Sequence, residues 1–215
     1  MKDLLSLVKT DLRRKRVLVR VDLNIPKCGE QVEDASRIEA MVPTIKRLFQ
    51  KKAKIIILSH LGRPKQGTKN NLSLSSIIPE LSKHLSFAKI IFCKDCIGAS
   101  VSRAIQSSQP NEIVLLENLR FHDGEERNDQ TFARLLSKNG DIYVNDAFSV
   151  SHRQHASVVG ITKHLPAFAG LSLKRELHYL DKILKKPKKP SLGIIGGSKI
   201  STKIGVIKGL TKKLD

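Results

Sequence analysis

Short apolar segments that end abruptly in polar residues recur along this chain, and no other feature constrains its fold as strongly. Each segment is rich in Ile, Val and Leu and has the length of a single strand. They occupy residues 16–21, 55–58, 112–116, 141–144 and 191–195. Longer amphipathic stretches separate them. This alternation predicts an α/β fold, a parallel sheet with helices on both faces in a Rossmann-like, three-layer α/β/α arrangement.

Helical spacing of apolar residues identifies the segments between the strands. The first, residues 35–52, would place one apolar face against the sheet, made of Ile38, Met41, Val42, Ile45, Leu48 and Phe49. Further helices are predicted at residues 74–85, 99–105, 129–136 and 172–184, with another that begins near residue 202. The last strand and the last helix would start a second domain that is only begun.

Arginine follows three of the predicted strands. Arg63, Arg120 and Arg153 each lie shortly after an apolar segment, and His60 precedes Arg63. Ligands of α/β sheets bind at the carboxyl ends of the strands, and a guanidinium group matches carboxylate and phosphate oxygens. We therefore expect the three arginines to converge on one anionic ligand. For any one of them alone, the alternative is an ordinary strand-to-loop turn with a solvated side chain.

The formal net charge is +19, which raises the question of nucleic-acid binding. Basic and aromatic residues are not interleaved, and no nucleic-acid fold signature is present, so we expect no specific nucleic-acid partner. The densest basic run, residues 185–190, contains two prolines and is interpreted as a linker at a domain boundary. A weak, salt-sensitive affinity for polyanions is compatible with this charge.

Cysteine content and hydropathy indicate a cytoplasmic protein. Cys28, Cys93 and Cys96 are the only cysteines, too few for a disulfide framework. Cys93 and Cys96 form a CxxC pair, but a second pair that would complete a zinc site is absent, so no metal site is predicted. No apolar run approaches the roughly 20 residues that span a bilayer, and residues 1–16 lack the apolar core of a signal peptide. We expect no membrane partner.

Six motifs together resemble the phosphoglycerate kinase family. They are residues 19–26 (VRVDLNIP), 59–64 (SHLGRP), 116–121 (LENLRF), 145–148 (NDAF), 152–157 (HRQHAS) and 196–203 (GGSKISTK). The motifs occur in the order and at the spacing of that family, and the resemblance extends from about Leu4 to the end of the chain. The 215 residues amount to roughly half the length that the family leads one to expect.

The resemblance implies a glycolytic transferase. Family members move the acyl phosphate of 1,3-bisphosphoglycerate to ADP, reversibly, giving ATP and 3-phosphoglycerate. Residues 1–170 would form the phosphoglycerate-binding domain, 171–190 an interdomain helix and linker, and 191–215 the first βα unit of the nucleotide-binding domain. Mg-ATP or Mg-ADP would be the second substrate, and a monomer is expected.

The resemblance also assigns roles to individual residues. For Asp22 and Asn24 a simple turn before Pro26 is the alternative, and for the Gly196–Gly197 pair a turn is the default. The substrate-binding set would be Asp22, Leu23, Asn24, Arg37, His60, Leu61, Gly62, Arg63, Arg120 and Arg153. The catalytic set would be Arg37, Lys199 and Lys203, and the nucleotide-binding set Gly196, Gly197, Lys199 and Lys203.

The length of the chain leads to three expectations about activity. This chain alone is expected to have little or no turnover, because most of the family's nucleotide site would follow residue 215. The alternatives are a non-catalytic 3-phosphoglycerate-binding fragment, or one half of a split enzyme whose missing domain comes from a separate chain.

Overall fold

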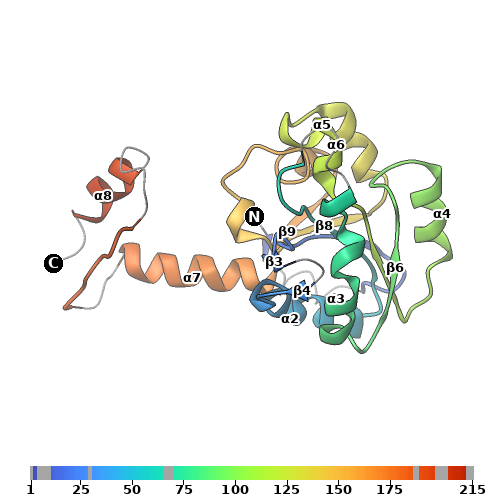
Figure 1. The fold of residues 1–215 in the computed structure, drawn as a ribbon, viewed down its shortest axis with the longest axis horizontal. Coiled ribbons are helices and arrows are strands. Elements are labelled where there is room, and N and C mark those ends of the chain that lie inside the picture. The colour runs from blue at the N-terminus through green and yellow to red at the C-terminus, as the bar shows by residue number, and fades with distance from the viewer. Residues whose placement is uncertain are drawn as a thin grey trace. The chain divides into compact units, whose positions relative to one another are not determined.

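The computed structural model describes residues 2–3, 11–28, 31–64, 70–185, 189–196 and 203–211 (Figure 1). The chain divides into two compact units, residues 1–174 and residues 175–215.

A parallel sheet forms the centre of the first unit. In the described residues it has seven strands in the order β1-β9-β8-β2-β5-β7-β6, and every neighbouring pair is parallel. The strands are β1 (Lys2–Asp3), β2 (Arg16–Arg20), β5 (Lys54–Leu58), β6 (Lys89–Phe92), β7 (Glu112–Leu115), β8 (Ile142–Asn145) and β9 (Ala167–Ala169). A small antiparallel hairpin joins β3 (Lys27–Cys28) to β4 (Gln31–Val32). The predicted α/β fold is confirmed.

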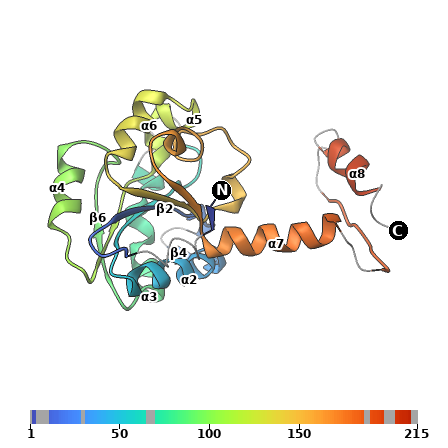
Figure 2. The same ribbon diagram turned by 180° about the vertical axis from the view of Figure 1, so that it is seen from behind.

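Helices cover both faces of this sheet, with α2 and α3 on one side and α5 and α6 on the other (Figures 1 and 2). The helices are α2 (Ser36–Gln50), α3 (Ile78–His84), α4 (Ala99–Ser107), α5 (Asp123–Glu126), α6 (Gln130–Ser137), α7 (Leu171–Lys185) and α8 (Ile204–Leu210). Short 3-10 turns occupy Asn70–Leu72, Leu74–Ile77, Leu119–Phe121, Phe148–Val150 and Gly160–Lys163. The predicted helices all occur, and the one expected at 74–85 opens with the 3-10 turn at Leu74.

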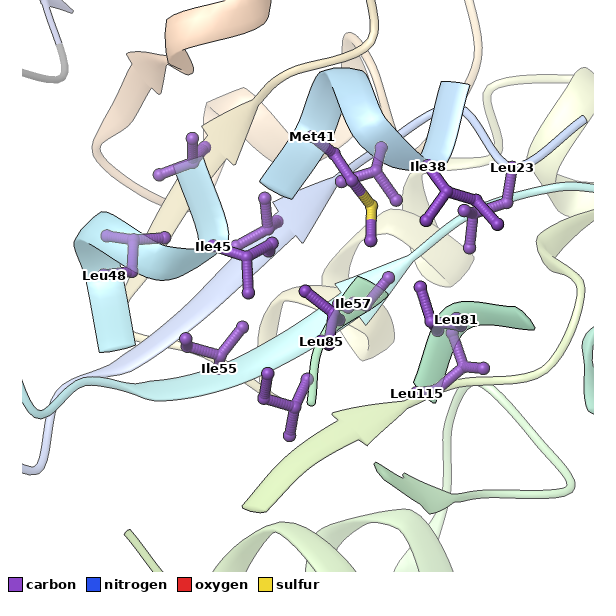
Figure 3. Close-up of a cluster of buried hydrophobic side chains, with 14 of the residues drawn as sticks. Leu23, Ile38, Met41, Ile45, Leu48, Ile55, Ile57, Leu81, Leu85 and Leu115 are labelled. Carbon is purple, nitrogen blue, oxygen red and sulfur yellow. The ribbon is translucent and has the colours of Figure 1, made fainter. Parts of the chain in front are cut away.

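Alternation along the strands builds two cores, one on each face. In β2, Val17 and Val19 join the cluster beneath α2 and α3, whereas Leu18 joins the cluster beneath α4 and α6. A strand buried on both faces therefore reads as one continuous apolar run. Figure 3 shows the first cluster, where Met41 and Ile45 of α2 approach side chains of β5 and α3. The buried face of α2 is the one that the sequence predicts.

The start of α7 is fixed by Asp146, which directly follows β8. Its Oδ1 atom accepts hydrogen bonds from the N–H groups of Ser172 and Leu173, at 2.8 and 3.2 Å. These N–H groups have no partner within the helix, so the carboxylate acts as a cap. Gly170 makes this approach possible, because a Cβ atom there would lie 2.1 Å from the same carboxylate oxygen.

One predicted strand is wrong. Residues 191–196 have no regular secondary structure and pair with no strand among the described residues, and Leu192 and Ile194 are 86% and 88% exposed. A β-strand is defined by hydrogen bonds to a neighbouring strand. The apolar run at residues 191–195 has no such partner in the described part of the second unit.

No helix in the described ranges has the length and apolar character needed to cross a membrane.

Replacing Ile45 by Ala should destabilise the first unit by roughly 2–5 kcal/mol, because it leaves a cavity between α2 and the sheet. Ile45 is fully buried, whereas the adjacent Lys46 is exposed on the same helix. Lys46→Ala is the matched control and should stay within about 0.5 kcal/mol of the parent chain. Urea unfolding measures both, and equal stabilities for the two variants would contradict this packing.

Candidate functional site

The candidate site lies where four neighbouring strands end together. In the sheet register, Arg20 at the end of β2 lies opposite Leu58 of β5 and Asn145 of β8. Likewise, Ile57 of β5 lies opposite Leu115 of β7. Because these ends are level, the polar residues that follow them gather at one edge of the sheet.

Arg20 is the most deeply buried cation at this edge. Arg20 is the last residue of β2 and is only 1% exposed, although its side chain carries a charge. Nε donates to Ser157 Oγ at 3.0 Å, and Nη2 lies 3.1 Å from His60 Nδ1. Since a guanidinium group can only donate, His60 Nδ1 must accept, and its proton sits on Nε2. His60 therefore presents a neutral imidazole.

Burial and positive neighbours keep His60 neutral. Desolvation lowers the pKa of His60 to about 2, helped by the positive charges of Arg20, Arg120 and Arg153. The charges of three guanidinium groups thus act on one imidazole, and Arg20 is in direct contact with it. With His155, which acts on the same imidazole, these residues form the basic cluster (Arg20, His60, Arg120, Arg153 and His155).

Arg120 shows the electrostatic strain of this cluster. Its side chain follows β7, is buried, and donates from Nη1 to Gly62 O at 2.7 Å. Burial lowers the pKa of Arg120; Glu126 opposes that shift, whereas Arg153, Arg20 and Arg63 add to it. Its Nε atom lies 3.1 Å from Glu126 Oε1 but lacks hydrogen-bond geometry. One exposed carboxylate thus faces several cations.

Arg153 has unused hydrogen-bonding capacity. Its Nε atom is buried and finds no hydrogen-bond acceptor in the described residues. A buried charged donor without an acceptor is costly, which is typical of a site that awaits an anion. Arg63 is exposed and acts on Arg120 through its charge. The structure therefore brings together the three arginines that the sequence predicts to converge.

A buried carboxylate, Glu125, is connected to the basic cluster through Ser157. Glu125 is fully buried and accepts from the N–H and Oγ of Ser157, at 2.9 and 2.5 Å. The same Ser157 hydroxyl accepts from Arg20 Nε. Glu125 also lies 3.7 Å from His155 Nδ1. Burial lowers the pKa of His155, and the charge of Glu125 opposes that shift.

Gly62 links the basic cluster to a second group of polar residues. Its N–H donates to Asn24 Oδ1 at 2.7 Å, while its carbonyl accepts from Arg120. Its φ of 61° is left-handed, and a Cβ atom would lie 2.7 Å from Leu72 Cδ2. The left-handed φ favours glycine at this position, and a larger residue would also displace the Leu72 side chain.

Asp22 organises that second group. Its Oδ2 atom accepts from Arg37 Nη1 at 2.7 Å and from Ser149 Oγ at 2.5 Å. Its Oδ1 atom accepts from the N–H of Asn24 at 3.0 Å, which is the local turn that the sequence offered as the alternative. The Arg37 side chain is 43% exposed and is held by Asp22 at the start of α2.

Leu23 and Leu61 contribute shape rather than polar groups. Both side chains are buried in the core beneath α2 and α3. The N–H of Leu23 donates to Ser59 Oγ at 2.9 Å, and the carbonyl of Leu61 accepts from Asn118 Nδ2 at 2.7 Å.

Two open pockets flank Gly62 and Arg120. One, of about 270 Å³, is lined by Asn24, Ile25, Lys27, Leu61, Gly62, Asn71 and Leu72. The other, of about 290 Å³, is lined by Pro64, Arg120, His122, Asp123, Glu126 and Arg127.

The predicted nucleotide residues belong to the second unit. Gly196 is exposed with open space around its Cα, and Lys203 donates from Nζ to the Gly196 carbonyl at the start of α8. Gly197 and Lys199 lie outside the described residues.

Sequence reasoning missed Arg20, His155 and the Glu125–Ser157 pair. The sequence does contain a signal for Arg20, which is a charged residue within an apolar strand. Charged residues are rarely buried unless they are paired, so this position indicates a specific set of partners. His155 belongs to the motif at residues 152–157, and its burial beside Glu125 distinguishes it from the exposed His152.

Comparison with known proteins gives a consistent result. A family model described as phosphoglycerate kinase matches residues 7–215. The phosphoglycerate kinase of Rhizobium johnstonii is 50% identical over 206 residues, which cover 96% of this chain and 51% of that relative. That of Rippkaea orientalis is 47% identical over 215 residues, covering 100% of this chain and 54% of the relative.

Solved structures agree with the sequences. Phosphoglycerate kinase from Coxiella burnetii superposes with a TM-score of 0.80 at 36% identity, covering 96% of this chain and 51% of that one. The Pyrococcus horikoshii enzyme superposes with a TM-score of 0.86 at 28% identity, covering 99% and 53%. The chain spans about half the length of the curated relatives it matches. From its motifs, its parallel sheet and these matches, the chain belongs to the phosphoglycerate kinase family.

Proposed function

We propose that the first unit binds 3-phosphoglycerate and 1,3-bisphosphoglycerate for reversible phosphoryl transfer with ADP and ATP. The observation that carries this proposal is the basic cluster, where Arg20 contacts a neutral His60 and the charges of Arg120 and Arg153 act on the same imidazole. Such an excess of buried positive charge is stabilised by a dianionic phosphate, to which guanidinium groups donate strong, charge-assisted hydrogen bonds.

The basic cluster and the group around Asp22 would bind opposite ends of the substrate. The phosphate at carbon 3 would bind the basic cluster, with Arg63 at its exposed side and the His60 Nε2–H as a neutral donor. The hydroxyl and carboxyl end would bind at Asp22 and Asn24. Gly62 connects the two sets of residues, because its N–H donates to Asn24 and its carbonyl accepts from Arg120.

Arg37 is the catalytic residue of the proposal. It is held by Asp22 at the carboxyl end of the substrate, where the acyl phosphate forms and breaks. Phosphoryl transfer depends mainly on positioning and on neutralising charge at the transferring oxygens. An exposed, oriented guanidinium group can do both without acting as a base.

The nucleotide side of the reaction rests on the family alone. Gly196, Gly197, Lys199 and Lys203 would approach the phosphates of Mg-ATP or Mg-ADP, with magnesium held largely by phosphate oxygens and water. Transfer would also require the two substrates to meet in a site closed to water.

A narrower candidate for this chain by itself is binding of 3-phosphoglycerate without turnover. It is favoured because the basic cluster, Gly62 and the Asp22 group all lie within residues 1–174, a compact unit with its own cores. Binding by this unit would need nothing from residues 175–215.

Arg153→Ala should weaken binding of 3-phosphoglycerate by roughly 10- to 100-fold, because a lost hydrogen bond to a charged group costs roughly 1.5–3 kcal/mol. Calorimetric titration of the purified chain at low and high salt measures this loss. Arg134→Ala, which removes an equal charge from an exposed position on α6, is the control. Equal weakening by both variants, or by neither, would remove Arg153 from the pocket.

Arg37→Ala should lower kcat by roughly 10³-fold or more while leaving 3-phosphoglycerate affinity nearly unchanged. The assay uses this chain joined to the remaining half of the Rhizobium johnstonii relative. Arg47→Ala, exposed on the same helix, is the matched control and should keep full turnover. A large loss of affinity with unchanged kcat would contradict the catalytic role.

His60 should stay neutral throughout the range of about pH 5 to 8, in which an ordinary histidine titrates. Its pKa is about 2 in the folded chain, so the unfolded chain binds more protons below about pH 6.5. Its contribution to stability is therefore complete above that pH and is lost progressively as the pH falls.

NMR titration of the His60 ring tests the neutral state, and urea unfolding from neutral to acidic pH tests the linkage. His60→Gln should flatten the dependence of unfolding free energy on pH. A His60 resonance that titrates with a midpoint near 6.5 would contradict the buried, neutral imidazole.

A further inference from the structure

A second cluster of polar side chains lies apart from the proposed substrate contacts. Asp95 and Cys96 belong to the loop after β6, and His122 follows the 3-10 turn after β7. One donor atom from each of these residues lies within 4.8 Å of the other two. Asp95 and Cys96 are adjacent in sequence, whereas His122 is distant, and the parallel pairing of β6 with β7 brings the two loops together.

The three side chains are held in place by their surroundings. The His122 ring stacks on Phe132 with centroids 4.8 Å apart, and its Nε2 atom lies 2.7 Å from Asp95 Oδ1. Cys96 is fully buried, and its thiol donates to the Glu117 carbonyl, with Sγ and O 2.9 Å apart. The imidazole nitrogen and the sulfur thus both lie close to a half-exposed carboxylate.

We propose that Asp95, Cys96 and His122 bind a divalent cation of the zinc class. Sulfur, nitrogen and carboxylate oxygen are the ligands that Zn²⁺ takes in proteins, at about 2.0–2.3 Å. In a tetrahedral site those bonds place ligand atoms about 3.4–3.6 Å apart. Three donor atoms within 4.8 Å of one another come close to that spacing.

Binding requires movement of the Asp95 side chain. The Asp95 Oδ1–His122 Nε2 distance of 2.7 Å must open by less than about 1 Å, and rotation of the half-exposed side chain supplies this at the expense of the hydrogen bond that Oδ1 accepts from the Cys96 N–H at 2.6 Å. The metal replaces the Cys96 thiol proton, which leaves to solvent. A water molecule can take the fourth position, because His122 lines the open pocket of about 290 Å³.

The charges around the sulfur favour a cation. The carboxylates of Asp95, Glu117 and Glu125 all act electrostatically on Cys96. Arg120 lines the same pocket, but its Nη1 atom is bonded to the Gly62 carbonyl and its Nε atom faces Glu126. The sequence-based prediction of no metal site considered Cys93 as the partner of Cys96, whereas the fold supplies His122 and Asp95 instead.

Cobalt and zinc titrations of the metal-free 215-residue chain test this site. Co²⁺ should produce a sulfur-to-metal charge-transfer band that saturates at one equivalent. Added Zn²⁺ should displace the Co²⁺ and abolish the band. Cys96→Ser, His122→Gln and Asp95→Asn should each weaken Zn²⁺ binding by roughly tenfold or more in competition with a coloured chelator. Cys96→Ser keeps a hydroxyl able to donate to the Glu117 carbonyl.

Two controls separate this site from adventitious binding. Cys93→Ser removes the neighbouring thiol, and His84→Gln removes a surface histidine that lies 3.3 Å from a Glu80 oxygen. Both should leave Zn²⁺ affinity unchanged. Absence of the charge-transfer band in the unmodified chain would overturn the proposal without reliance on any variant. Unchanged Zn²⁺ affinity in Cys96→Ser and His122→Gln would also overturn it.

Discussion

The burial of Arg20 is the constraint on which the proposed site depends. A cation with 1% exposure needs a partner for its donors, and Ser157, His60 and the Val21 carbonyl provide them. The buried Glu125 accepts from the same Ser157 hydroxyl that accepts from Arg20 Nε, so it is linked to the guanidinium group through Ser157. In the proposed function, an anion would bind the remaining donors of the basic cluster.

The backbone of Gly62 then links the basic cluster to the Asp22 group. Gly62 adopts a left-handed conformation that glycine takes most easily, and its two backbone polar groups contact Asn24 and Arg120. In the proposed function, the phosphate and carboxyl groups of 3-phosphoglycerate would therefore bind residues that are connected through one glycine. Contacts of this kind would let strand ends far apart in sequence act as a single site.

The sequence predicted the sheet, its helices and the convergence of Arg63, Arg120 and Arg153, because periodicity and strand-end polarity are local signals. It missed β6 and β9, which are short and only partly buried, so their apolar patterns are weak. It placed a strand at residues 191–195, where pairing depends on a neighbour that an apolar run cannot specify. It also missed Arg20 and His122, whose environments depend on contacts between distant loops.

The most direct test of the account is an NMR titration of the 215-residue chain with 3-phosphoglycerate, read at the backbone amides. The account predicts saturable shifts confined to the residues that follow β2, β5, β7 and β8, with the Gly62 amide among the largest. Shifts centred elsewhere, or none at concentrations that saturate a complete phosphoglycerate kinase, would contradict the claim that these strand ends form the substrate pocket.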